Sequence, residues 1–335
     1  MIIRENFSLR DVTTLHLDVR CDRFVEYETV DELRQLLTGE LRGKQFLHIG
    51  GGSNLVFSGH FNGYILHSLM RKIAVVREDE QSVWVEAESG HVWDDFVRFC
   101  VEHGYYGAEN MSNIPGECGA SAVQNVGSYG AEAKDIIHEV KAISTADGAE
   151  RVFSCQDCRF AYRDSIFKNE LKGKYIITSV IYRLGKTPRF NLSYGALQHL
   201  NPNTITLQGV RDAIIGIRAS KLPDPAVTGS VGSFFKNPII ARERYEALLR
   251  QFPDMPKYDI DTDTVKVPAG WLIEHCDLKG HRIGGAYVYE KQCLVLANSG
   301  TATCHDMVAL SRHVIASVAA KFSITLSPEA NIIEC

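Results

Sequence analysis

The chain has 335 residues, of which 45% are hydrophobic and 23% charged, and its formal net charge is -5. This length allows two or three domains with a sizeable core. The weak acidic excess argues against nucleic acid as the main partner, and no apolar run is long enough to cross a bilayer. Because the N-terminal residues also lack the apolar core of a signal peptide, we expect a cytoplasmic protein with no membrane partner. We further expect a monomer.

The nine cysteines are an odd number scattered through the chain, which favours a reducing compartment over a disulfide framework. Cys155 and Cys158 form the one C-x-x-C pair. Without a second such pair to complete a zinc site, we predict a structural role for these two residues and no metal, with redox chemistry as the alternative.

In chain order, the first part of the chain alternates between strand and helix patterns. Asp31 is expected to cap a helix that runs to Leu37. Alternating side chains predict a half-buried strand at residues 83–88, and helical spacing at residues 92–102 ends at Gly104. Further strands are predicted at residues 25–27, 46–49 and 64–66.

The remainder of the chain mixes both kinds of element, so we expect an α+β fold. A helix at residues 208–219 ends before the segment Leu222-Pro223-Asp224-Pro225, which is the clearest boundary in the chain. A last strand at residues 325–333 is free to return to an earlier domain. The other predicted strands are residues 139–144, 175–184 and 287–296, and the other predicted helices are residues 241–251, 269–275 and 303–322.

Two glycine-rich segments are the most informative features of the sequence. The first, Gly50-Gly51-Gly52-Ser53-Asn54, directly follows an apolar strand, and the second occupies residues 113–130. Residues without bulk let the backbone approach a ligand closely, and their N–H groups can hold phosphate or carbonyl oxygens. Either segment alone would be read as a tight turn, whereas the pair predicts one extended, anionic, nucleotide-like ligand.

The spacing within these segments excludes two common nucleotide sites. Neither segment has the G-x-G-x-x-G pattern of a Rossmann unit, and the chain has no complete P-loop. The two segments therefore favour FAD bound in another flavin-binding architecture.

Four short segments carry polar side chains that helix or strand packing does not require. Arg163 stands between aromatic residues and could present a fixed, planar donor to a carboxylate or enolate. Ser233 follows a glycine and precedes Lys236, while Glu329 follows a proline that ends a strand. Tyr194 could hold its phenol over a ligand. The alternatives are an ion-paired surface arginine, a hairpin turn, a solvated glutamate and a simple turn.

The order of the segments is GGGSN, IPGxxGASxxQNVGSYG, RFAYRDSIF, SYG, KLPDP, GSFFKNP, AGWLIExCxLKGxRIGGA and PExxII. It strongly resembles the UDP-N-acetylenolpyruvoylglucosamine reductase family, flavoenzymes of bacterial peptidoglycan precursor synthesis. The resemblance covers essentially the whole chain, and GSFFKNP and YRDSIF are its most specific pieces. The segment with Tyr194 resembles the first of the family's two types, in which that tyrosine closes over the substrate.

The resemblance implies a three-domain flavoprotein with a non-Rossmann FAD-binding architecture of the PCMH, or vanillyl-alcohol-oxidase, type. The two FAD-binding subdomains would be residues 1–69 and residues 70–222 plus 323–335. The C-terminal substrate domain would be residues 223–322.

The resemblance also implies the reaction. NADPH would reduce non-covalently bound FAD, and hydride would then pass to the vinyl methylene carbon of UDP-N-acetylglucosamine enolpyruvate, giving UDP-N-acetylmuramate. Negative charge builds up on the neighbouring carbon and its carboxylate, and Arg163 and a protonated Glu329 would stabilise it. Ser233 would donate the final proton, helped by a lysine or an ordered water because a serine hydroxyl is a weak acid.

The binding residues are carried over from the family's motifs. Those expected to hold the cofactor are Gly50, Gly51, Gly52, Ser53, Asn54, Ile114, Pro115, Gly116, Gly119, Ala120, Ser121, Gln124, Asn125 and Gly127. Those expected to hold the substrate are Tyr129, Tyr162, Tyr194, Arg218, Lys221, Lys236 and Asn237. Relatives often have a basic residue two positions after the Pro-Glu pair, where this chain has Asn331, so no cationic contribution is expected from that strand.

Two other functions compete with the reductase. The nearer one is an FAD-dependent oxidase or dehydrogenase of the same architecture, but many of those attach flavin through a histidine in the first glycine loop, and this loop has none. The other is a nucleotide-binding scaffold, which would have no need of Arg163, Ser233 and Glu329 together.

Overall fold

The computed structural model describes all residues from 1 to 335. The chain divides into two compact units, each built from several chain segments. The first unit contains residues 1–7, 21–52 and 61–219, and the second contains residues 8–20, 53–60 and 220–335. None of the helices combines the length and the apolar character that a membrane span requires. The division into three domains stays a prediction.

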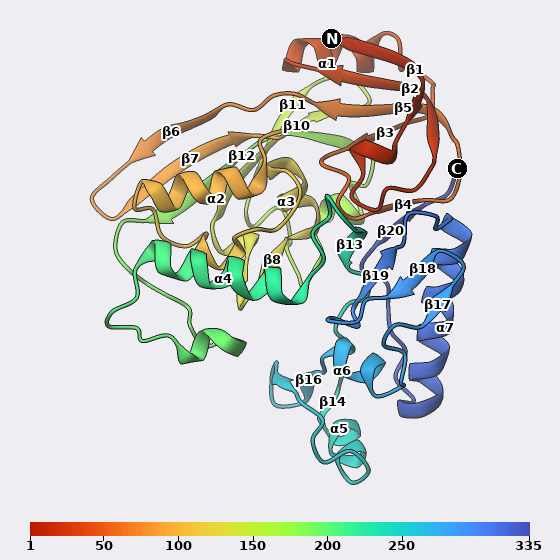
Figure 1. The fold of residues 1–335 in the computed structure, drawn as a ribbon. Helices are drawn as coiled ribbons and strands as arrows, with labels where there is room; N and C mark the ends of the chain where they lie inside the picture. Colours follow the sequence, from red (N-terminus) through yellow and green to blue (C-terminus); the bar gives the residue numbers. More distant parts are fainter. The chain divides into compact units, whose positions relative to one another are not determined.

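The first unit contains two separate sheets, of which the smaller has four strands (Figure 1). Its strand order is β1 (Ile2–Ser8), β2 (Arg20–Tyr27), β5 (Phe61–Ser68) and β3 (Phe46–Ile49). β2 and β3 both run parallel to β5. Helix α1 (Val30–Thr38) buries Leu33, Leu36 and Leu37 in the same cluster as Leu66 of β5, because leucines at this spacing share one helix face.

The larger sheet of the first unit is antiparallel. Its strand order is β11 (Glu150–Ser154), β10 (Ile137–Ser144), β12 (Tyr175–Gly185), β7 (Ser82–Glu88) and β6 (Ile73–Glu78). Helices α2 (Trp93–Glu102), α3 (Cys118–Gln124) and α4 (Leu207–Lys221) belong to the same unit, as does the short hairpin of β8 (Gly127–Ser128) and β9 (Ala131–Glu132). α2 packs on the sheet through Phe96, whose ring centroid lies 4.3 Å from that of Tyr182 on β12.

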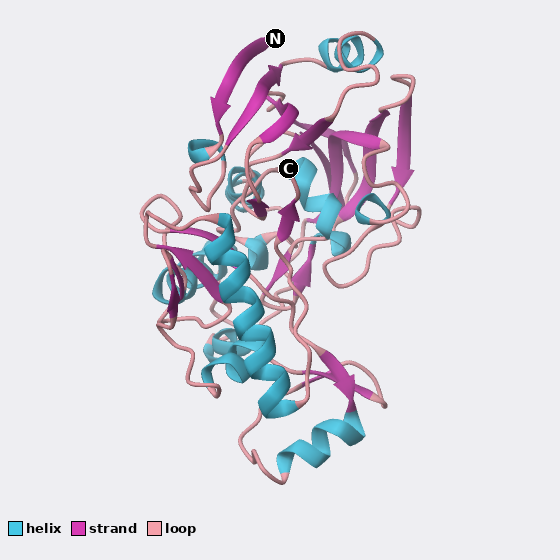
Figure 2. Cartoon of the chain, turned by 90° about the vertical axis from the view of Figure 1, so that its right-hand side faces the viewer, coloured by secondary structure: helices cyan, strands magenta, loops and turns pink.

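The second unit has three small sheets. Their strands are β13 (Gly229–Ser233), β19 (Val295–Asn298), β18 (Ala286–Val288) and β17 (Arg282–Ile283); β14 (Ile239–Ala241), β16 (Thr264–Lys266) and β15 (Tyr258–Asp259); and β20 (Asn331–Ile333) with β4 (Leu55–Phe57). Its helices are α5 (Arg242–Leu249), α6 (Ala269–Glu274) and the long α7 (Cys304–Phe322), which runs beside the first of these sheets (Figure 2).

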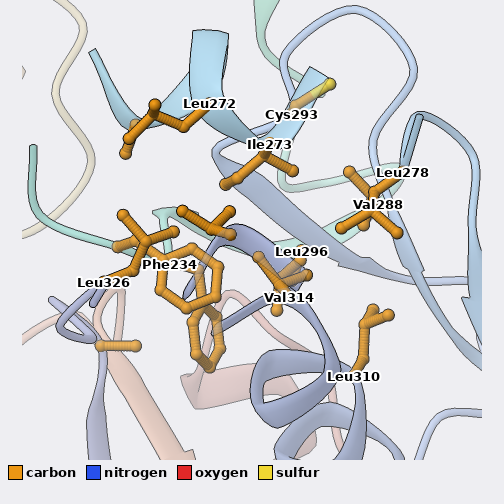
Figure 3. Packing of buried hydrophobic residues seen from close by; sticks show 14 of the residues in the cluster. Phe234, Leu272, Ile273, Leu278, Val288, Cys293, Leu296, Leu310, Val314 and Leu326 are labelled. Carbon is orange, nitrogen blue, oxygen red and sulfur yellow. The ribbon is translucent and has the colours of Figure 1, made fainter. Parts of the chain in front are cut away.

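Phe234 lies in the hydrophobic core of the second unit. Figure 3 shows its ring close to Leu326, in a cluster to which Ile273 of α6 and Val314 of α7 also belong. The phenylalanine is completely buried. The core therefore fixes the backbone immediately after Ser233.

The α+β composition and most of the predicted elements are confirmed. The last strand does return to an early part of the chain, since β20 pairs in parallel with β4. It is shorter than predicted, because residues 325–330 are joined to the segment after β13 by single backbone contacts instead of a continuous ladder.

Two predictions about elements are wrong in detail, and a third is confirmed only in part. Thr29, and not Asp31, caps α1, because its side chain accepts a hydrogen bond from the Glu32 N–H. The strand predicted at residues 287–296 is two antiparallel strands, β18 and β19, joined by a polar turn. On the face of β7 that carries Glu86 and Glu88, those two glutamates are partly exposed, but Trp84 is buried, because the guanidinium groups of Arg77 and Arg183 cover it at 4.1 and 5.3 Å from its ring.

Candidate functional site

The two glycine segments meet within the first unit. A Cβ placed on Gly51 would lie 3.4 Å from the Cα of Gly116, and one placed on Gly50 would lie 3.3 Å from the Cβ of Ala120. Gly52 has a φ of +60°, which side chains disfavour. The absence of side chains at these positions gives the two turns room to lie against each other.

Some residues expected to bind the cofactor have side chains that are engaged within the protein. The hydroxyl of Ser121 donates to the carbonyl of Cys118 and lies 2.9 Å from the Tyr182 hydroxyl. The amide of Asn125 donates to Glu132 and to the carbonyl of Ala161, and its oxygen accepts from the Lys134 N–H. Both side chains therefore hold the second glycine segment in shape.

Gly119 has a packing role as well. A Cβ at this position would lie only 2.7 Å from the Cβ of Ser89, and the Gly119 N–H donates to the Ser89 carbonyl at 3.0 Å. The start of α3 can approach this loop only because residue 119 has no side chain.

Arg163 lies at the tip of a tight turn that touches the end of the second glycine segment. Ala161 and Asp164 exchange two backbone hydrogen bonds of 3.1 Å, which places Tyr162 and Arg163 at the turn's centre. The Arg163 guanidinium donates to the carbonyl of Gly127 at 2.5 Å. A predicted catalytic residue and a predicted cofactor-binding residue are thus in direct contact.

Three residues expected to bind substrate also gather in the first unit. The rings of Tyr129 and Tyr194 meet edge to face, with their centroids 6.2 Å apart. Burial raises the pKa of the Tyr129 hydroxyl, and the nearby charge of Arg218 partly opposes this shift. Asn110, which was not among the predicted site residues, joins the two tyrosine loops by donating to the carbonyls of Tyr129 and Asn191.

Arg218 and the second glycine segment are held in place by an ion pair between a buried arginine and a partly buried aspartate, for which the sequence has no local signal. Arg211 of α4 donates two hydrogen bonds of 2.7 Å to Asp94 of α2. Asp94 also accepts from the Asn113 N–H, while the Asn113 carbonyl accepts from Arg218. Burial opposes ionisation of Asp94, but the hydrogen bonds from Arg211 and Asn113 outweigh it and hold the pKa of this carboxyl below its usual value.

Asp94→Asn should lower the free energy of unfolding by about 2 kcal/mol near neutral pH, because the buried Arg211 guanidinium loses its counter-charge. Since the pKa of Asp94 is lower in the folded state, this stabilisation exists at higher pH and is lost as pH falls through that pKa. Urea unfolding at several pH values measures both effects. The exposed Asp95 pairs with Arg98 on the same helix, so Asp95→Asn is the matched control and should change little. If the free energy of unfolding that Asp94→Asn loses stayed the same as the pH was lowered, the ion pair with Arg211 would be contradicted.

The second unit brings Ser233 and Glu329 together. The Glu329 N–H donates to the carbonyl of Phe234, the residue after Ser233, at 2.8 Å. Gly232 has a φ of +69° and the ladder of β13 is interrupted between Ser230 and Ser233, so the strand bulges just before the serine. Two residues that lie far apart in the sequence thus become neighbours through their backbones.

Asn54 of the first glycine segment holds the Glu329 segment. Its side-chain amide donates to the Glu329 carbonyl at 3.1 Å, and its own carbonyl accepts from the Asn331 N–H at 3.0 Å. Asn54, expected to bind the cofactor, therefore also positions a predicted catalytic residue. Asn331, the first residue of β20, contributes through this backbone hydrogen bond.

The remaining predicted residues of the second unit have different surroundings. The Asn237 side chain accepts from the Ala269 N–H at 2.9 Å and so caps α6. The Lys236 N–H donates to the carbonyl of Ser327, which fixes the backbone beside Pro328. Lys221 is exposed at the end of α4.

A buried cluster of charged side chains beside the glycine turns was missed by sequence reasoning. The ring of His67 on β5 faces Glu117 at 2.9 Å and Glu26 at 3.3 Å. A glutamate within an otherwise glycine- and alanine-rich segment was a visible signal for Glu117. No residue near His67 in the sequence indicated this contact, because the fold brings His67 and Glu117 together from distant parts of the chain.

The Cys155–Cys158 pair shows no sign of reactivity. Burial raises the pKa of both thiols, that of Cys158 to about 12, which disfavours the thiolate. No group of three or more His, Cys, Asp or Glu side chains in the structure is arranged to hold a metal ion.

Comparison with known proteins gives consistent matches over the whole chain. Residues 21–154 match a family described as FAD binding domain, and residues 224–333 match one described as UDP-N-acetylenolpyruvoylglucosamine reductase, C-terminal domain. The UDP-N-acetylenolpyruvoylglucosamine reductase of Bacteroides fragilis is 47% identical over 99% of this chain and 100% of its own length. That of Neisseria gonorrhoeae is 42% identical over 98% and 97%. The crystal structure of the corresponding reductase from Thermus caldophilus has the same fold, with a TM-score of 0.70, 21% identity and 99% of each chain covered.

Proposed function

The chain belongs to the UDP-N-acetylenolpyruvoylglucosamine reductase family, and from this premise we propose that Arg163, Ser233 and Glu329 carry out its reduction step. The protein is an FAD-dependent oxidoreductase that reduces UDP-N-acetylenolpyruvoylglucosamine in peptidoglycan precursor synthesis. The observation that supports the assignment of residues most strongly is the backbone contact that makes Ser233 and Glu329 neighbours.

The two glycine turns fit FAD. Gly50 and Gly51 let the first turn lie close to Gly116 and Ala120 of the second, and we assign FAD to the backbone N–H groups of these paired turns. When bound, FAD accepts a hydride from NADPH and delivers it to the vinyl methylene carbon of the substrate. The remaining cofactor-binding residues expected from the sequence flank these glycines in the chain, and their contacts with FAD are part of the proposal.

Arg163 and Glu329 stabilise the charge that follows hydride delivery. The negative charge spreads from the neighbouring carbon onto the substrate carboxylate, and donors fixed in advance lower the energy of this state without reorganising. Arg163 meets this requirement because its turn and its hydrogen bond to Gly127 hold the guanidinium. Glu329 takes the same role on a segment that Phe234 and Asn54 hold at two backbone atoms.

Ser233 supplies the proton that completes the reduction. The hydride forms one C–H bond, and the Ser233 hydroxyl gives its proton to the adjacent carbon to form the second. Phe234 is buried in the core, so the backbone that carries the Ser233 hydroxyl keeps a fixed position. Because a serine hydroxyl is a weak acid, a lysine or an ordered water must restore its proton.

Tyr129, Tyr162, Tyr194, Arg218, Lys221, Lys236 and Asn237 hold the UDP-sugar in this proposal. The contacts among Tyr129, Tyr194 and Arg218 support a shared role for these three residues. The cytoplasmic location and the monomeric state remain predictions.

An anaerobic visible spectrum of the purified protein tests the proposal. Addition of NADPH should bleach the flavin band, and subsequent addition of UDP-N-acetylglucosamine enolpyruvate should restore it. A flavin that remained bleached until air was admitted would indicate an oxidase. A protein without any flavin band would contradict the FAD assignment.

A further inference from the structure

His67 is held between two carboxylates. Its Nε2 lies 2.9 Å from Oε1 of Glu117, and its Nδ1 lies 3.3 Å from Oε1 of Glu26. An ionised carboxylate only accepts hydrogen bonds, so both ring nitrogens must carry a proton to satisfy both partners. With both carboxylates ionised, an imidazolium ion at residue 67 satisfies this geometry.

Glu117 needs that positive charge more than Glu26 does. Arg4 also pairs with Glu26, at 2.6 Å, whereas His67 is the one ion-pair partner of Glu117 in the structure. The Glu117 side chain is 6% exposed, and its second oxygen, Oε2, is buried without a hydrogen-bond partner. A buried carboxylate that lost its only counter-charge would have to move, take up a proton or admit water.

Glu117 lies where the two glycine turns meet. Its Oε2 is 3.2 Å from the position that a Cβ on Gly50 would take, and its Cγ is 3.8 Å from the corresponding position on Gly51. Its chain neighbour Gly116 makes the close approach to Gly51. A displacement of the Glu117 side chain would thus alter the fit between the two turns.

The surroundings of His67 favour its protonated form. Burial lowers its pKa, but the hydrogen bonds and charges of Glu117 and Glu26 outweigh burial and hold the pKa above the usual value. His48 on β3 remains neutral, because burial and the charge of His67 lower its pKa to about 3. His48 is hydrogen-bonded to the hydroxyl of Tyr27, and burial raises the pKa of this hydroxyl. The two residues therefore add no charge near neutral pH.

We propose that His67 and Glu117 are positioning residues for FAD. Their buried ion pair fixes the second glycine turn against the first, so tight FAD binding requires a protonated His67. The inference rests on the proposed placement of FAD at the two turns. It adds a specific pair of side chains, and a pH dependence, to a cradle otherwise made of backbone.

FAD titration of the apoprotein, followed by quenching of flavin fluorescence, tests the proposal. For a group with a raised pKa, the favourable state is complete at low pH and is lost as pH rises through that pKa. The FAD Kd of the wild type should therefore rise about tenfold from about pH 6 to about pH 9. His67→Gln should show the weaker affinity throughout, with no pH dependence. Glu117→Gln removes the other half of the ion pair, so it should also bind FAD more weakly throughout, with little pH dependence.

His138→Gln is the matched control, because His138 also faces a glutamate, Glu139, but in an exposed pair of the same unit. Its FAD curve should follow the wild type, and thermal unfolding of each apoprotein checks that the variants fold. A His67→Gln variant with wild-type affinity and pH dependence would overturn the proposal. Gly51→Val tests the placement of FAD separately from the role of the ion pair. If Gly51→Val does not weaken FAD binding, FAD does not lie at the two glycine turns. If Gly51→Val weakens FAD binding while His67→Gln has no effect, FAD lies at the turns but the ion pair does not position it.

Discussion

Ser233→Ala should leave the reduction of FAD by NADPH unchanged and slow flavin reoxidation by the enolpyruvyl substrate about a thousandfold. The variant loses the proton donor, while the backbone of residue 233 is still held by Phe234 in the core and by the register with Val295. Anaerobic stopped-flow absorbance measures the two half-reactions separately. A slower reoxidation with unchanged reduction would identify a specific role of Ser233, because misfolding or loss of FAD would affect both half-reactions.

Ser230→Ala provides the matched control for this experiment. Ser230 lies on the same strand, β13, and is buried, but its backbone pairs with Thr14 and Ala297. Its reoxidation rate should stay close to that of the wild type. In deuterated water, the wild type should show a solvent isotope effect on reoxidation that Ser230→Ala retains. Rapid reoxidation of Ser233→Ala would remove Ser233 as the proton donor.

Glu329→Asp should slow reoxidation by the substrate about a hundredfold or more, because the carboxyl group withdraws from the position where charge develops. Glu329→Gln keeps a hydrogen-bond donor on a side chain of the same length and should slow reoxidation less. The backbone of residue 329 is fixed by Phe234 and Asn54 in both variants, so the comparison isolates the side chain.

Glu334→Gln, on the exposed end of the same segment, is the control for a simple loss of charge. Its reoxidation rate should equal that of the wild type. If neither Glu329 variant slows this half-reaction, the glutamate does not stabilise the developing charge. If Glu329→Gln slows reoxidation more than Glu329→Asp does, the side chain acts as an anion and not as a neutral donor.

The sequence was most informative where a residue acts through its own type or through its chain neighbours. The glycines at 50, 51 and 116 predicted backbone that a ligand can approach closely, and the structure shows the two turns that carry them packed against each other. The helical spacing that predicted residues 303–322 matches α7, which begins one residue later because Thr303 is its cap. Both predictions rest on local physical chemistry.

Local patterns could not show which partner a side chain finds in the fold. Ser121 and Asn125 lie in a ligand-binding motif, yet their side chains bond to Tyr182 and Glu132 within the protein. The pairing of His67 with Glu117 depends on β5 running beside the second glycine segment, and nothing near residue 67 in the sequence indicates it. Such contacts are decided by topology.

The pairing of β4 with β20 has a consequence for how the protein is made. β4 leaves the ribosome long before its partner strand β20 is synthesised. Closing so long a loop is slow, so the second unit can complete its core only late in synthesis. A chain interrupted before residue 329 would carry both glycine turns and Ser233 but no Glu329, and Asn54 would lack the carbonyl to which it donates. Nascent or truncated chains are therefore expected to be inactive in substrate reduction even where their first unit has already folded.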